Sequence, residues 1–137
     1  MAQVVRFSRA ISTATVNAIL AALDGGSSGA TIKIYTGTMP TTPETGIGAQ
    51  VLLGTCTCSD PAAVESGGTL TFSAITNDSS ADNTGTATWA RYADSSGTAC
   101  FDGNVGTVGS GAWIEMVTTS IVAGGPIAFT SGTITLP

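Results

Sequence analysis

Residues 98–137 read TACFDGNVGTVGSGAWIEMVTTSIVAGGPIAFTSGTITLP, and this stretch decides the fold class. Short runs of β-forming residues alternate there with glycine-rich turns, which predicts several short strands joined by tight connections. Gly103, Gly106, Gly109 and Gly111 have the spacing of loop glycines. Side chains that perform enzyme chemistry are almost absent from the stretch, so it indicates a structural β-protein.

Upstream of this stretch, apolar residues also recur with a period of two, which is typical of half-buried strands. In residues 31–36, Ile32 and Ile34 share one face, while Lys33 and Tyr35 share the other. About eight strands are expected at roughly ten-residue spacing, at residues 31–36, 50–58, 68–76, 86–93, 98–101, 113–118, 126–129 and 133–136. This spacing predicts an antiparallel β-sandwich or jelly roll.

One amphipathic N-terminal α-helix is expected over residues 12–24, with Ser12 as its N-cap and Gly25 directly after its end. Its apolar residues fall on one helical face, and they are Val16, Ile19, Leu20 and Leu23. Residues 1–11 then form an N-terminal arm, and residues 12–137 form a single β-sandwich domain that includes the helix.

The chain carries little charge. Only 9% of its residues are charged, against about 25% in ordinary soluble domains. Its net charge is −5 with four cations, too few for a basic patch, so binding to nucleic acid or to an anionic membrane is not expected. A surface this poor in charge predicts coverage by a partner. The alternative is a threonine-rich β-domain that stays soluble alone.

Catalysis, metal binding and cofactor binding are not expected. The chain has no histidine, which removes the commonest general base and metal ligand. Its carboxylates mostly lie in predicted turns, where they usually accept backbone hydrogen bonds. Glu115 lies instead in a predicted strand, and we expect it to point into solvent. Residues 77–83 are rich in oxygen donors but lack the spacing of a calcium loop, so a turn is expected there.

The three cysteines are expected as free, mostly buried thiols of a protein made in a reducing compartment. Cys56 and Cys58 stand two residues apart in a predicted strand, which places both on one face, where they are poorly placed to bridge each other. A disulfide between Cys58 and Cys100 is the alternative. The apolar run 18–23 is too short for a secretory signal, so export is not expected.

Three stretches resemble small structural proteins of the tailed-bacteriophage virion. They are ATIKIYTGTMP at 30–40 after the predicted helix, GTATWARY at 85–92 continuing to FDGNVGT at 101–107, and TSIVAGG at 119–125 running on to ITLP at 134–137. Together these stretches span most of the chain. Within that group, the resemblance is to capsid cement proteins, which are also called decoration proteins.

This resemblance implies a non-enzymatic jelly-roll or sandwich protein on the outer surface of an icosahedral capsid. Its partners would be the major capsid protein and further copies of itself, as a dimer or trimer. It would be made in the cytoplasm of the host bacterium. A tail or baseplate module that binds host glycans is the alternative function. A secreted adhesin or pilin-like subunit would need export, against which the N-terminus argues.

Six residues are candidates for partner contact, and they are Arg6, Arg9, Met39, Pro40, Pro43 and Trp113. The two arginines lie in the predicted arm of an acidic protein. The two prolines restrict the loop 37–48, which lowers the entropy lost on binding. Trp113 follows a glycine-rich segment, and tryptophan is enriched at interfaces. Trp113 beside Glu115 is also the one sequence feature that suggests glycan binding.

Overall fold

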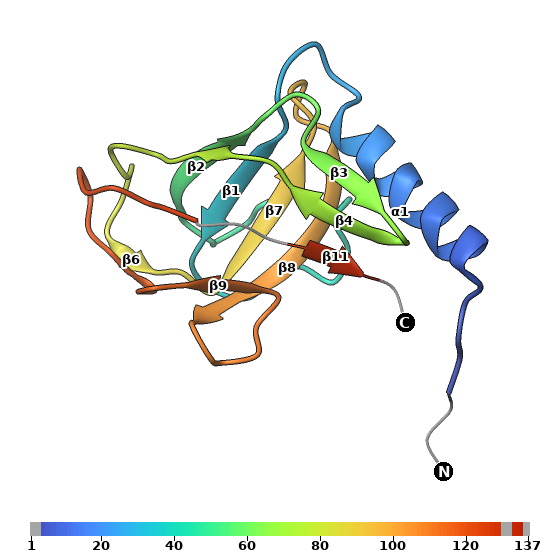
Figure 1. The fold of residues 1–137 in the computed structure, drawn as a ribbon. Helices are drawn as coiled ribbons and strands as arrows, with labels where there is room; N and C mark the ends of the chain where they lie inside the picture. The colour runs from blue at the N-terminus through green and yellow to red at the C-terminus, as the bar shows by residue number, and fades with distance from the viewer. Residues whose placement is uncertain (1–3, 130–132, 136–137) are drawn as a thin grey trace.

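The computed structural model describes residues 4–129 and 133–135, which form a mainly β protein with one helix (Figure 1). The helix α1 spans Arg9–Leu23. The strands are β1 (Thr31–Tyr35), β2 (Leu52–Cys58), β3 (Ala63–Ser66), β4 (Thr69–Phe72), β5 (Ile75–Thr76), β6 (Gly85–Thr86), β7 (Trp89–Ala93), β8 (Ala99–Thr107), β9 (Ile114–Met116), β10 (Ser120–Ile121) and β11 (Thr133–Thr135).

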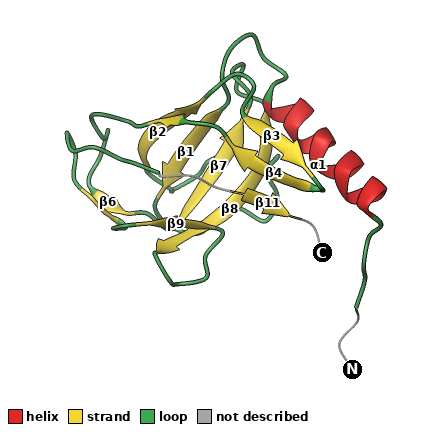
Figure 2. Ribbon diagram, viewed as in Figure 1, coloured by secondary structure: helices red, strands yellow, loops and turns green. Residues whose placement is uncertain are grey.

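The strands form two layers with the helix along one side. The larger sheet has the order β5-β2-β1-β7-β8-β9, and a smaller sheet has the order β11-β4-β3. A short pair joins β10 and β6. Figure 2 shows the smaller sheet in front of the larger one, with α1 beside β3 and β4. The predicted class, a β-sandwich with one helix, is confirmed.

The core lies between the two sheets and under α1. Ile32 and Ile34 of β1 point into it, as their period-two pattern predicts. Tyr92 of β7 joins the layers. Its ring centroid lies 5.7 Å from that of Phe72 in β4 and 4.3 Å from that of Phe101 in β8, on which it stacks. The larger fully buried side chains are Trp89, Leu23, Ile32, Ile34, Leu53, Leu70, Ile127, Val16 and Cys56.

The helix begins earlier than the predicted residue 12. Ser8 is the N-cap, and its side chain accepts a hydrogen bond from the backbone N–H of Ile11 at 3.3 Å. Ser12 lies buried inside the helix, so the predicted cap was wrong. The first turn is exposed and lacks apolar periodicity, which is why the pattern missed it. Arg9 therefore belongs to the helix, and residues 1–3 of the predicted arm lie outside the described residues.

The helix also ends differently from the prediction. It stops at Leu23, with Asp24 as its C-cap, and Gly25 does not take the left-handed conformation expected of a terminating glycine. The carboxylate of Asp24 accepts a hydrogen bond from the backbone N–H of Ala62 at 2.9 Å. This contact ties the helix end to the segment that leads into β3.

The strand β8 is much longer than the predicted 98–101, because Gly103 and Gly106 lie within it. A side chain at position 103 would overlap the indole of Trp113. Glycine is needed there for close packing, so assigning it to a loop was wrong. The pairing of β8 with β9 is parallel, whereas the sequence predicted antiparallel strands throughout.

Further strand predictions also need correction. The short strands β3 and β10 were not predicted. Residues 126–129 contain an isolated antiparallel bridge between Asp78 and Ile127 instead of a strand. The predicted strand 68–76 is split into β4 and β5, which belong to different sheets. The predicted strand 86–93 is likewise divided between β6 and β7, which also belong to different sheets. Residue 136 of the last predicted strand lies outside the described residues.

Replacement of Ser8 by alanine should lower the free energy of unfolding by about 1 kcal/mol, because an N-cap hydroxyl is lost. Urea unfolding followed by circular dichroism measures this change. The matched control is Ser27→Ala, since Ser27 is exposed and lies outside the helix. Equal stability of the two variants would contradict the assigned helix start.

Candidate interaction surface

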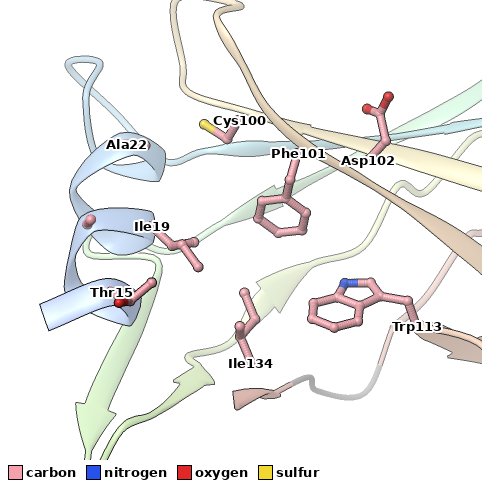
Figure 3. Close-up of a pocket in the computed structure, with 9 residues that line it drawn as sticks. Thr15, Ile19, Ala22, Cys100, Phe101, Asp102, Trp113 and Ile134 are labelled. Carbon is pink, nitrogen blue, oxygen red and sulfur yellow. The ribbon is translucent and has the colours of Figure 1, made fainter. Parts of the chain in front are cut away.

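An apolar groove of about 510 Å³ opens between α1, β8 and β11 (Figure 3). It lies where the two sheets separate along one side, next to the helix. Its lining residues are Thr15, Ala18, Ile19, Ala22, Cys100, Phe101, Asp102, Trp113 and Ile134. Nearly all of these side chains are apolar or small, so the groove suits an apolar side chain more than a charged ligand.

Trp113 stands at the mouth of this groove. Its side chain is 49% exposed, and its ring meets Phe101 edge-on, with centroids 6.3 Å apart. Its backbone N–H donates a hydrogen bond to Oδ1 of Asn104 at 2.9 Å. The indole is thus fixed against Gly103 and Phe101 on one side and open to solvent on the other.

Glu115 holds the loop before Trp113. Its carboxylate accepts hydrogen bonds from the backbone N–H groups of Gly109 at 3.1 Å and Gly111 at 2.9 Å. These bonds lower the pKa of Glu115 below its ordinary value. Glu115 is exposed, as expected, but its oxygens serve the loop. Trp113 is therefore not paired with a free carboxylate, which is the arrangement that suggested glycan binding.

An ion pair between Arg91 and Asp102 organises the opposite face of the larger sheet. Nε of Arg91 lies 2.7 Å from Oδ1 of Asp102, and Nη2 lies 2.8 Å from Oδ2. Nη1 donates to the carbonyl of Thr45 at 2.9 Å, and the guanidinium lies 5.4 Å from the ring centroid of Trp89. The hydrogen bonds to Asp102 raise the pKa of Arg91.

The loop 37–48 is fastened at several points along its length. Thr88 donates its hydroxyl to the carbonyl of Gly37 at 2.6 Å, and Arg91 holds Thr45. Gln50 donates to the carbonyl of Thr38 at 2.6 Å and accepts from the N–H of Gly48 at 2.8 Å. The loop is consequently pre-ordered before any partner arrives.

The structure places the six predicted contact residues on three separate segments. Met39 is exposed on the loop 37–48, and Pro40 and Pro43 are half-buried there. Arg6 is exposed in the arm, whereas Arg9 starts the helix beside Gly67 of the β3–β4 turn.

The sequence predicted Trp113 as a contact residue but did not reveal the rest of the groove. Its other lining residues come from segments far apart in the chain, so periodicity within one segment does not reveal them. One signal was present in the helix. Thr15, Ala18 and Ala22 form a stripe of small residues beside the apolar face, and a stripe of this kind leaves room against a helix.

Most of the other carboxylates that form hydrogen bonds within the described residues accept them from backbone N–H groups, as predicted. Asp78 accepts from the N–H groups of Thr55 and Ser80, which confirms the turn expected in 77–83. Asp94 accepts from the N–H groups of Ser96 and Thr98, and hydrogen bonds led by that of Ser96 lower its pKa. In the described part of the chain, no three His, Cys, Asp or Glu side chains gather as metal ligands.

All three cysteines are free thiols, which confirms the prediction and rules out the Cys58–Cys100 disulfide in this structure. Cys56 and Cys58 are buried, and desolvation raises the pKa of Cys58 to about 11. Cys100 is partly exposed and lines the groove, so it can report on occupancy of that site.

Comparison of the chain with protein-family models, with curated proteins and with solved structures gave no match. Within residues 4–129 and 133–135, α1 is too short and too polar to cross a membrane.

Replacement of Asp102 by asparagine should lower the free energy of unfolding by about 3 kcal/mol, because it leaves the nearly buried Arg91 without its counter-charge. Urea unfolding measures this loss. Asp82→Asn is the control, since Asp82 is exposed. A loss below about 1 kcal/mol would show that the pair behaves as a surface salt bridge.

The loop before Trp113 should loosen in acid. A carboxylate with a lowered pKa stabilises the fold above its unfolded pKa, about 4.3 for glutamate, and loses that effect as pH falls through the folded value. We therefore expect Trp113 fluorescence to change below about pH 4. Glu115→Gln should already show the altered emission at pH 7. A pH response that is identical in Glu115→Gln would contradict this assignment.

Proposed function

We propose that this protein is a non-enzymatic structural subunit of a tailed-bacteriophage virion, acting as a cement protein on the outer surface of the capsid. The three virion-like stretches of the sequence support the phage origin. The distribution of polar and apolar groups supports a docking role, and it is the observation that carries the proposal.

Arg91 and several of the acidic side chains are engaged within the fold itself. Arg91 and Asp102 bind each other, and Asp78, Asp94 and Glu115 accept backbone hydrogen bonds. Apolar side chains, by contrast, lie exposed on the arm, on the loop 37–48 and at the groove. Groups committed in this way are poorly placed to act on a substrate, whereas exposed apolar groups gain free energy when a partner covers them.

The loop 37–48 is the segment that we assign to contact with the capsid protein. Met39 and Ile47 are exposed on it, and the hydrogen bonds of Gln50, Thr88 and Arg91 hold its backbone. A pre-ordered loop loses little conformational entropy on binding, so more of its contact energy appears as affinity.

Stabilisation of the capsid would follow from linkage. A ligand that binds only the assembled shell stabilises it by RT ln(1 + [L]/Kd) per site. Repetition of the contact over many equivalent sites on one shell adds avidity. A specific contact buries about 1,000 Å² or more, so it would also include surface beside the loop.

Free thiols agree with assembly in the cytoplasm of the host bacterium, because disulfides are rare in reducing compartments. The partners would then be the major capsid protein and further copies of this chain. The tail or baseplate alternative shares the same fold and composition. Its glycan-binding form has less support, because Glu115 is engaged by the loop before Trp113.

Cosedimentation with tail-free, expanded capsids and with isolated tails tests the proposal. We expect saturable binding to capsids, and Ile47→Asp should weaken it at least tenfold because a charge is buried at the contact. Val122→Asp is the control, since Val122 is exposed on the turn after β10. Binding to tails alone would support the baseplate alternative, and binding to neither would reject a virion role.

A further inference from the structure

We propose that the arm segment, residues 4–8, lies extended in the groove of a second copy of this chain. Val5 and Phe7 would contact Phe101 and Trp113 of that copy. This contact concerns association of the protein with itself, so it can fail or succeed independently of the proposed binding to capsids.

The arm segment projects from the body with its apolar side chains uncovered. Figure 1 shows it leaving the start of α1 and running away from both sheets. The side chains of Val4, Val5 and Phe7 are all exposed, with Val5 at 60% and Phe7 at 44%. No hydrogen bond joins residues 4–7 to another described residue. An apolar segment left in this state is stabilised by any surface that removes it from water.

The start of the helix directs the arm away from its own groove. Ser8 has an extended backbone, with φ −63° and ψ 157°, and its side chain is engaged as the N-cap. A hydrophobic staple would hold Phe7 back against the fourth helical residue. That residue is Ser12, which is polar and buried, so Phe7 has no staple partner. The groove of another copy is therefore the better placed receptor.

The lengths of the arm and the groove agree. From Thr15 to Ala22 the helical wall extends about 10 Å, at about 1.5 Å per residue. Four extended residues cover about 13 Å, and alternate side chains point the same way. Val5 and Phe7 would thus enter the groove together, while Val4 and Arg6 would face outward.

The borders of the groove also suit an extended segment. The strand β11 is an edge of the smaller sheet, and its residue Ile134 lines the groove. An edge strand offers backbone groups to a further strand, which is a common mode of peptide recognition. Ile11 is exposed on the same helical stripe as Thr15 and Ala18, so apolar surface continues along the helix beyond the groove.

Charge favours this pairing of segments. Arg6 gives residues 4–8 a charge of +1, so the remainder of the −5 chain carries −6. A cationic arm reduces the repulsion between two acidic copies at the point where they meet. Each copy has one arm and one groove, so either a reciprocal pair or a closed ring satisfies every site.

A cysteine placed in the arm tests the contact, because Cys100 already lies in the groove. The variant Phe7→Cys with Cys100→Ser is mixed with the wild-type chain, oxidised with diamide, and its cross-linked peptides are identified by mass spectrometry. We expect a disulfide between residue 7 of one chain and Cys100 of the other. Val64→Cys with Cys100→Ser is the matched control and should give at least tenfold less of its product.

Sedimentation equilibrium gives an independent readout. We expect the wild type to associate reversibly, with Val5→Asp and Trp113→Ala each weakening association at least tenfold. Val64→Asp should leave it unchanged, although Val64 is also 60% exposed. A monomeric wild type, or equal effects of Val5→Asp and Val64→Asp, would overturn the proposal. An intrachain disulfide in Phe7→Cys that retains Cys100 would also overturn it, because the arm would then occupy its own groove.

Discussion

The ion pair between Arg91 and Asp102 is the interaction on which much of this structure depends. It joins β7 to β8, and the same guanidinium packs over Trp89 and holds the carbonyl of Thr45. The chain has only four cations, so engaging one of them in this way is a strong constraint. It couples the centre of the larger sheet to the loop 37–48, and the exposed residues of that loop are therefore carried on a rigid support.

The groove follows from incomplete closure of the two layers. The strands β8 and β11 belong to different sheets, and α1 covers only part of the space between them. Gly103 lets the indole of Trp113 lie directly on β8, and Glu115 fixes the loop that delivers it. A sandwich that buried this region fully would have no apolar groove to offer. The incomplete closure of the two layers is thus what leaves an apolar groove suited to docking.

The sequence predicted the parts of the fold that depend on local pattern. Ile32 and Ile34 of β1 and Leu70 and Phe72 of β4 alternate as half-buried strands should, and the structure buries them. It could not predict the parallel pairing of β8 with β9, because strand direction depends on contacts outside either strand. Gly103 was misassigned because its role depends on Trp113, ten residues later. The groove was missed because its walls meet only after folding. The virion role stays a prediction, which rests on the resemblance of the sequence to virion proteins and on the exposed apolar side chains.

A density map of the assembled virion, at a resolution that traces side chains, is the most direct test of the proposed place of this chain in the virion. We predict this chain on the outer surface of the capsid, with Met39 and Ile47 against the capsid protein and with Val5 and Phe7 in the groove of a neighbouring copy. A map that places the chain in the tail, or that leaves the loop 37–48 and the groove facing solvent, would contradict it.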